Sequence, residues 1–379
     1  MKNKRAKTRV LAFVCLFFAI VFVFSIFVGD RTAHAATTAR SMCVMETGSK
    51  RVLEGKNQQQ KLPMASTTKI MTAITAIEYC KDLDEVFEID PRAVGISGTS
   101  IYLRKGEKMS TKDLLYGLML VSGNDAACAI ACHVGGSEKE FVGLMNFLAR
   151  KIGAHNTHFD NPHGLDSKTH YTTAYDLALI TSYALQNDTF KEIVSTTNIK
   201  TTNSDGKVRY LRNKNKLLTK MEGCCGVKTG FTNDAGRCLV SACEQDGMTI
   251  VCVVLNCGPM FEESQTLLEE MFAKYSLCNL TKFCQIPSRL QIAQGKSEFV
   301  SISTKDDIIL PLSQAEKEAI KTKLALQQNL EAPIDKGSEV GEVEIFINND
   351  LHFSQKIYTM ENVRRNSIWQ KVKNFIDRW

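Results

Sequence analysis

The stretch PMASTTKIMTA, residues 63–73, places a serine and a lysine three positions apart at the start of an apolar, helix-like run. On a helix, positions i and i+3 share a face, so Lys69 can lay its amine beside the hydroxyl of Ser66. Such a pair can make a neutral alcohol into a nucleophile without a histidine. Because Pro63 cannot lie inside the helix, Ser66 is expected near the helix N-terminus, where unpaired amides stabilise negative charge. Ser-x-x-Lys alone is common, so the rest of the chain decides its meaning.

A second candidate is Ser122-Gly123-Asn124, which breaks two helices expected at 112–120 and 126–132. Residues 110–113, STKD, resemble a capping box that opens the first of these helices. A serine and an asparagine two positions apart in such a break can both point into one cleft. A helix-linking turn with capping residues explains the same pattern.

The third candidate is Lys228-Thr229-Gly230, which we expect on a strand beside two strand-like runs at 236–242 and 249–255. The Asp-Gly pair at 246–247 predicts a hairpin turn between those runs. A glycine in a strand allows a ligand to approach the backbone closely. A lysine and a threonine hydroxyl beside it suit a carboxylate. Alone, Lys-Thr-Gly is common and indicates little.

Elsewhere the pattern mixes helices and strands. A strand, a turn and a strand are expected at 40–54, and helices are expected at 70–79, 141–152, 171–185 and 262–275. His163 and His170 lie in or beside turn-rich loops and are candidate bases in principle. Loop histidines are more often structural, and neither has an obvious acidic partner in the sequence.

The N-terminus has the layout of a secretory signal peptide. Five basic residues between positions 2 and 9 precede an unbroken apolar run at 10–28, and Ala33-His34-Ala35 offers small residues for cleavage. We expect cleavage after Ala35, although the run is long enough for an uncleaved signal anchor. Either way, the bulk of the chain is predicted to lie outside the cytoplasm.

Composition excludes several classes of protein. The net charge is only +6, part of it in the extreme N-terminus, so nothing indicates a nucleic-acid-binding surface. The thirteen cysteines include no Cys-x-x-Cys pair, so no zinc site is expected. Cys128 and Cys132 are four apart on an expected helix, where a disulfide fits poorly. We interpret most cysteines as buried small hydrophobes in a protein whose surroundings are not oxidising.

The character of the chain changes after about Cys284. Short apolar alternations separated by turns predict a small β-rich domain without a catalytic cluster. Residues 361–379 form a basic amphipathic pattern that carries both tryptophans, Trp369 and Trp379. This pattern is typical of a helix in a membrane interface. A helix packed on the domain or on another subunit is the alternative.

The three candidates together, and in this order, resemble the signature of penicillin-binding proteins and serine β-lactamases. The longer context resembles the serine D-alanyl-D-alanine carboxypeptidases of low molecular mass. The matching segments are ASTTKIMT at 65–72, SGNDA at 122–126, NPHGL at 161–165, HYTTAYD at 170–176 and GVKTG at 226–230.

The resemblance implies an α/β (α+β) fold in which an antiparallel sheet is flanked by helices, with the active-site cleft between them. It also implies a small, β-sandwich-like domain and a C-terminal anchor. We therefore predict a signal peptide at 1–35, a transpeptidase-like domain at 36–283, a β-rich domain at 284–360 and a membrane-anchor helix at 361–379.

The resemblance also implies a reaction. Ser66 would attack the carbonyl between the last two residues of a stem peptide ending in D-Ala-D-Ala, and Lys69 would accept its proton. Ser122 would relay a proton to the leaving D-alanine. Asn124 would hold a substrate amide. Lys228 and Thr229 would meet the carboxylate, and Gly230 would let the substrate approach the strand closely. The backbone amides of Ser66 and Phe231 would hold the oxyanion. Penicillins would acylate Ser66, and no metal or cofactor is implied.

One departure concerns carboxylate recognition. Many relatives carry an arginine downstream of Lys-Thr-Gly, whereas residues 256–264 here read NCGPMFEES. Arg237 is the nearest arginine in the sequence.

Two rival functions stay open at this point. A β-lactamase needs rapid deacylation, but the loop near residue 160 lacks the Glu-x-x-x-Asn pattern that would support it. A non-catalytic wall-binding protein could keep the fold, although all three motifs are intact. The resemblance places the enzyme at the outer face of the cytoplasmic membrane or in the cell wall.

Overall fold

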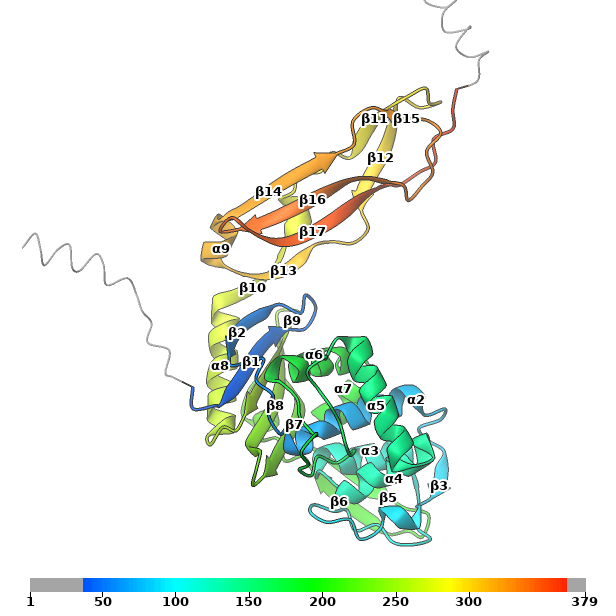
Figure 1. Ribbon diagram of the computed structural model, residues 1–379, viewed down its shortest axis with the longest axis vertical. Helices are drawn as coiled ribbons and strands as arrows, with labels where there is room; N and C mark the ends of the chain where they lie inside the picture. Colours follow the sequence, from blue (N-terminus) through cyan, green and yellow to red (C-terminus); the bar gives the residue numbers. More distant parts are fainter. Residues whose placement is uncertain (1–36, 367–379) are drawn as a thin grey trace, which may run out of the picture. The chain divides into compact units, whose positions relative to one another are not determined.

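The computed structural model describes residues 37–366, and everything below concerns that part of the chain (Figure 1). The signal peptide predicted at 1–35 lies outside the described residues, as does most of the predicted anchor helix, from residue 367 on. Among the described helices, none is long and apolar enough to cross a membrane.

A five-stranded sheet forms the centre of the first part of the chain. Its order is β2-β1-β9-β8-β7, and every neighbouring pair is antiparallel. The strands are β1 (Ser41–Glu46), β2 (Val52–Lys56), β7 (Cys224–Thr232), β8 (Gly236–Gln245) and β9 (Met248–Leu255). Asp246 and Gly247 join β8 to β9 with φ values of 49° and 76°, the positive values that a tight hairpin requires. The predicted antiparallel sheet is confirmed.

A layer of helices covers one face of this sheet, and a single helix, α8, covers the other face. They are α2 (Lys69–Tyr79), α3 (Thr111–Leu120), α4 (Asn124–Gly135), α5 (Glu138–Ile152), α6 (Ala174–Ala184), α7 (Asp188–Ser195) and α8 (Met260–Lys274). Ser110 caps α3 by accepting a hydrogen bond from the backbone N–H of Asp113, as its sequence predicts.

The helix predicted at 171–185 begins later than expected. Thr172 pairs with Leu62 in an isolated β-bridge, and Thr173 then caps α6 by accepting a hydrogen bond from the Asp176 N–H. The apolar periodicity therefore predicted a helix that starts too early, because Tyr171 and Thr172 form β-bridges with distant residues instead.

Successive side chains along each strand point to opposite faces of the sheet, so the apolar core is divided into two layers. Met45, Val240 and Val253 belong to the cluster shared with the helical layer, where α6 contacts β1 and β9 and α7 contacts β7. Val44 and Leu239 point the other way and pack with Leu268 of α8. Figure 1 shows α6 and α8 on opposite faces of the sheet. The sheet is thus buried on both faces.

Two small hairpins complete the helical layer. They are β3 (Val86–Glu88) with β4 (Lys108–Ser110), and β5 (Asn198–Thr202) with β6 (Val208–Arg212). Between β3 and β4 the chain makes a long excursion that includes residues 95–107, a loop that becomes important at the site.

The predicted β-rich C-terminal region is present, and its first strand begins at Tyr275, before Cys284. A six-stranded sheet has the order β14-β16-β17-β12-β11-β15, and β10 pairs with β13. The strands are β10 (Tyr275–Asn279), β11 (Arg289–Ala293), β12 (Phe299–Thr304), β13 (Ile309–Ser313), β14 (Ile320–Leu326), β15 (Leu330–Glu331), β16 (Glu339–Ile347) and β17 (Asp350–Thr359). A short helix, α9 (Gln314–Glu318), follows β13. This region has its own apolar core, including Val300, Val343 and Ile357.

The loop at 161–165 packs directly on the 3-10 turn η1 (Ala65–Thr68), which leads into α2. Gly164 has a φ of +91°, and a Cβ there would lie 2.0 Å from the Ala65 carbonyl oxygen. Only glycine therefore fits, because any side chain would push this loop off η1.

We expect Gly164→Ala to lower the free energy of unfolding by more than the ~1 kcal/mol that a left-handed alanine costs by itself. The matched control is Gly153→Ala: its φ is +97°, but nothing lies within 4 Å of the added Cβ. Urea unfolding of both variants measures the difference. Equal destabilisation would show that the contact with Ala65 is unimportant.

Candidate active site

Lys69 lies at the centre of the predicted site. It begins α2, its side chain is fully buried, and its amine lies within hydrogen-bond distance of oxygen atoms from three segments. Nζ lies 3.1 Å from Ser66 Oγ, 2.7 Å from Asn124 Oδ1 and 2.5 Å from the His163 carbonyl oxygen. The i, i+3 spacing predicted from the sequence therefore does bring Ser66 and Lys69 into contact.

The environment of Lys69 favours its neutral form. Burial lowers its pKa well below the ordinary value, and the positive charge of Lys228 lowers it further. Its three hydrogen-bond partners carry no negative charge. A neutral amine holds a lone pair, so Lys69 in that form can accept the hydroxyl proton of Ser66.

Backbone strain flanks the Ser–Lys pair. Ala65, directly before Ser66, has a φ of 49°, and Ser122 in the break between α3 and α4 has a φ of 70°. Non-glycine residues adopt this region at a cost of about 1 to 3 kcal/mol, and such residues cluster at functional sites. Ser122 is also buried, with 5% of its surface exposed.

Asn124 begins α4 and is oriented by contacts on both ends of its amide. Its Oδ1 accepts from Lys69, and its Nδ2 donates to the Ser97 carbonyl at 2.7 Å. Its backbone N–H donates to the Thr99 carbonyl, also at 2.7 Å. The loop at 97–99 therefore fixes which end of the amide faces Lys69.

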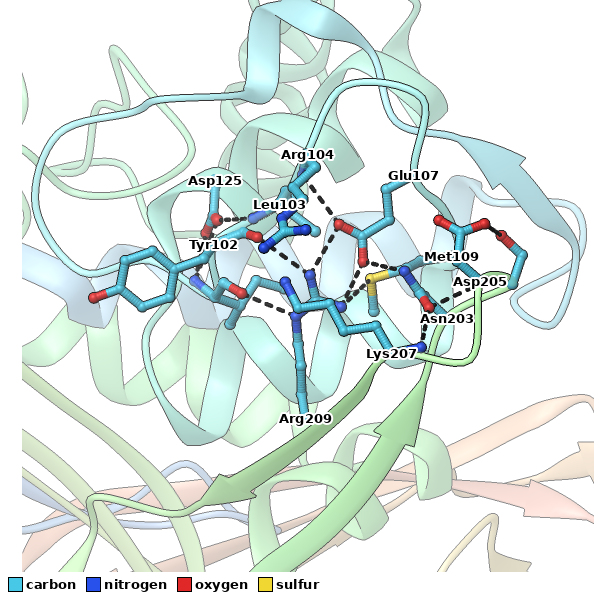
Figure 2. Close-up of polar contacts among 12 residues, drawn as sticks. Tyr102, Leu103, Arg104, Glu107, Met109, Asp125, Asn203, Asp205, Lys207 and Arg209 are labelled. Atoms are coloured by element: carbon cyan, nitrogen blue, oxygen red, sulfur yellow. Dashed lines mark hydrogen bonds and ion pairs between the residues drawn. The ribbon is translucent and has the colours of Figure 1, made fainter.

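The same loop is tied down by Asp125, the next residue along α4. Its carboxylate accepts hydrogen bonds from the backbone N–H groups of Ile101 and Leu103, both at 3.0 Å, and from Ser100 Oγ at 2.6 Å. Figure 2 shows the backbone N–H of Leu103 directed at the Asp125 carboxylate. Asn124 and its neighbour thus hold the loop from two directions.

A buried ion pair completes this support. Arg209 of β6 reaches Glu107 with Nη1 at 2.5 Å and Nη2 at 2.9 Å, and its Nε donates to the Ile101 carbonyl at 2.9 Å (Figure 2). Burial would raise the pKa of Glu107, but the hydrogen bonds from Arg209 and from the Arg104 N–H lower it overall. Arg209 is not predictable from the sequence, because nothing local links β6 to residue 107.

The strand β7 contains Lys228-Thr229-Gly230 and runs beside the segment that holds Ser66. A Cβ on Gly230 would lie 3.0 Å from the Ser66 backbone nitrogen, so the glycine permits a close approach of β7 to η1. Lys228 is buried and donates to the Thr229 carbonyl at 2.8 Å. Thr229 is half-buried, whereas Phe231 is 63% exposed.

Lys214 is a further cation that the sequence analysis did not select. Its backbone N–H donates to the Leu120 carbonyl at 3.1 Å, two residues before Ser122. Burial and the charge of Lys214 together lower the pKa of Lys228 to about 7, and Lys214 also lowers the pKa of Lys69. Lys69, Lys228 and Lys214 therefore interact electrostatically, although they come from distant segments of the chain.

The two loop histidines differ in role. His170 Nε2 lies 2.8 Å from Thr68 Oγ1, and its Nδ1 accepts from the Asp160 N–H at 3.0 Å. Burial lowers the pKa of His170 to about 4 and that of His163 to about 3, so both rings are neutral at pH 7. His163 meets Lys69 through its backbone carbonyl, so neither ring contacts the Ser66 hydroxyl.

The region where relatives carry an arginine is occupied differently. Residues from Met260 on form the first turns of α8. Arg237 is exposed on β8, and its Nη1 lies 3.4 Å from the Gly258 carbonyl oxygen. Lys228 and Lys214 are the cations that lie close enough to act on Lys69.

Comparison with known proteins agrees with this geometry. Residues 29–258 match the family model described as D-alanyl-D-alanine carboxypeptidase, and residues 279–365 match that of the penicillin-binding protein 5 C-terminal domain. The carboxypeptidase DacF of Bacillus subtilis is 30% identical over 359 residues, which cover 93% of this chain and 92% of that protein. DacC of Escherichia coli is 30% identical over 380 residues, which cover 95% of this chain and 93% of that protein.

Solved structures agree as well. Penicillin-binding protein 5 from Haemophilus influenzae superposes with a TM-score of 0.77 at 27% identity, covering 87% of this chain and 98% of that one. The fold and the comparisons together define a serine hydrolase of the penicillin-binding class. The chain belongs to the D-alanyl-D-alanine carboxypeptidase family.

The Arg209–Glu107 pair supplies a test of the loop that orients Asn124. Arg209→Met leaves a buried carboxylate without its partner, which costs about 3 to 5 kcal/mol, and we expect penicillin acylation to slow as the loop loosens. Arg212→Met, on an exposed position of the same strand, is the matched control. Urea unfolding and acylation kinetics measure both effects. An unchanged acylation rate in folded Arg209→Met protein would contradict this positioning role.

Proposed function

We propose that this protein removes the terminal D-alanine from peptidoglycan stem peptides that end in D-Ala-D-Ala, through an acyl-enzyme on Ser66. The observation that carries the proposal is the contact between Ser66 Oγ and the amine of Lys69, which is fully buried and has a lowered pKa. A nucleophile and a matched base within hydrogen-bond reach are what acyl transfer requires.

In the proposed reaction, Lys69 takes the Ser66 proton as Oγ attacks the carbonyl between the two alanines. The backbone N–H groups of Ser66 and Phe231 stabilise the oxyanion, which the close approach of β7 at Gly230 supports. Lys69 returns this proton through Ser122 to the nitrogen of the departing D-alanine. Water then gives a proton to Lys69 as it attacks the ester, and Lys69 passes that proton to Ser66 Oγ as the shortened peptide leaves.

Substrate binding is assigned to the remaining motif residues. Asn124 has its amide held at both ends and would contact a backbone amide of the peptide. Lys228 and Thr229 would bind the terminal carboxylate, with Gly230 keeping the strand close to the peptide.

We further propose that Lys214 takes the place of the arginine found in many relatives. Its charge already acts on Lys228 and Lys69, so a substrate carboxylate entering this region would meet at least two ammonium groups. A carboxylate would also raise the Lys228 pKa from about 7 and keep that group charged.

The proposal includes export and attachment at the outer face of the membrane or in the cell wall. Support comes from the sequence at 1–35 and from the basic amphipathic pattern at 361–379. Penicillins share the acyl chemistry of the substrate and are expected to form a lasting adduct.

The decisive experiment measures D-alanine release from a peptide ending in D-Ala-D-Ala. We expect release by the native protein and a loss of at least about a thousandfold in Ser66→Ala, because the nucleophile is gone. Intact mass after penicillin treatment should show one stable adduct, absent in Ser66→Ala. Rapid penicillin turnover would favour a β-lactamase, and no release by either protein would favour a non-catalytic wall-binding protein.

Replacing Lys214 tests the carboxylate site. We expect Lys214→Met to raise KM about five- to tenfold, as loss of a charged hydrogen bond would. Removing this charge also raises the pKa of Lys228, so the alkaline fall in kcat/KM, expected near pH 7 in the native protein, should move to higher pH. The exposed Lys220→Met is the control. A lower rate without a shifted pH profile would indicate a structural role only.

A further inference from the structure

A second cluster of reactive side chains includes the ring of His163, whose backbone carbonyl accepts a hydrogen bond from Lys69. It consists of Cys128 on α4, Glu138 in the first turn of α5 and the imidazole of His163. One potential ligand atom from each residue lies within 4.8 Å of the other two. We propose that these three side chains bind a zinc-like divalent transition-metal ion.

The distances are close to those that a tetrahedral ion needs. Cys128 Sγ lies 3.7 Å from Glu138 Oε2, and His163 Nε2 lies 3.9 Å from Glu138 Oε1. With metal–ligand bonds of about 2.0 to 2.3 Å, tetrahedral ligand atoms lie about 3.3 to 3.6 Å apart. Glu138 is 42% exposed and can move toward the two more buried ligands.

The chemistry of the donors also fits. Sulfur, imidazole nitrogen and carboxylate oxygen are the atoms that Zn²⁺ binds in proteins, and three protein ligands leave a fourth position for water. The bound Cys128 would lose its thiol proton to solvent. Thiolate and carboxylate together then balance the two charges of the ion, while the imidazole stays neutral.

The fold brings the ligands together and leaves a way in. The α4–α5 turn is tight: a Cβ on Gly135 would lie 2.7 Å from the Phe141 backbone nitrogen. This turn places residues 128 and 138 side by side. An open cavity of about 540 Å³ reaches Glu138 from solvent and is also lined by Val142, Asn146 and Phe159.

Binding has one local cost. His163 Nδ1 accepts a hydrogen bond from the Leu165 N–H at 3.2 Å, so the neutral ring carries its proton on Nε2. A metal on Nε2 requires that proton on Nδ1, and the Leu165 contact must then be given up. The same loop presents the His163 carbonyl to Lys69, so metal binding and the Lys69 contact are mechanically linked.

The test uses untagged, full-length, reduced protein that has been freed of metal and titrated with Co²⁺. We expect one equivalent of Co²⁺ to produce a thiolate-to-cobalt charge-transfer band and to release one proton. The band should be lost in Cys128→Ala and weakened in Glu138→Gln. It should survive in Cys132→Ala, which removes a buried cysteine one turn further along α4.

Zn²⁺ should also raise the Tm of the native protein and of Cys132→Ala, but not that of Cys128→Ala. Glu138→Gln changes a half-exposed position and keeps the test valid if Cys128→Ala fails to fold. Absence of a band in the native protein, or a band unchanged in Cys128→Ala and Glu138→Gln, would overturn the proposal.

Discussion

The burial of one amine constrains the rest of the site. Lys69 is fully enclosed, and its three hydrogen-bond partners are a hydroxyl, an amide oxygen and a backbone carbonyl. Without an anion among them, the charged form is poorly stabilised, and the neutral base that acyl transfer needs becomes accessible. The partners come from η1, α4 and the 161–165 loop, so three separate segments must be held in register to keep this amine in place.

The polar networks around the site can be understood from that requirement. Asp125 and the Arg209–Glu107 pair hold the 97–103 loop, which in turn orients Asn124 toward Lys69. Gly164 lets the 161–165 loop rest on η1. The left-handed backbone of Ala65 and Ser122 persists because these contacts over-determine it. Buried polar groups that are fully paired give such a site a single geometry.

The cations serve two purposes at once. Lys228 and Lys214 both lower the pKa of Lys69, and under the proposed function they would also bind the substrate carboxylate. The carboxylate would partly cancel the repulsion that makes Lys69 a base, so recognition and activation are coupled electrostatically. The Cys128–Glu138–His163 cluster is connected to this arrangement through His163, whose backbone carbonyl accepts a hydrogen bond from Lys69.

Local patterns in the sequence determined the Ser66–Lys69 contact, the β8–β9 hairpin and most helix bounds, because each depends on residues a few positions apart. The three motifs in order carried the family resemblance, and that resemblance implied the antiparallel sheet. Only the tertiary structure decided that Arg209 supports the 97–103 loop, that Lys214 joins Lys228, and that Cys128, Glu138 and His163 converge. Those groups meet across long loops, and their proximity depends on how the helices and hairpins pack, which no spacing along the chain encodes.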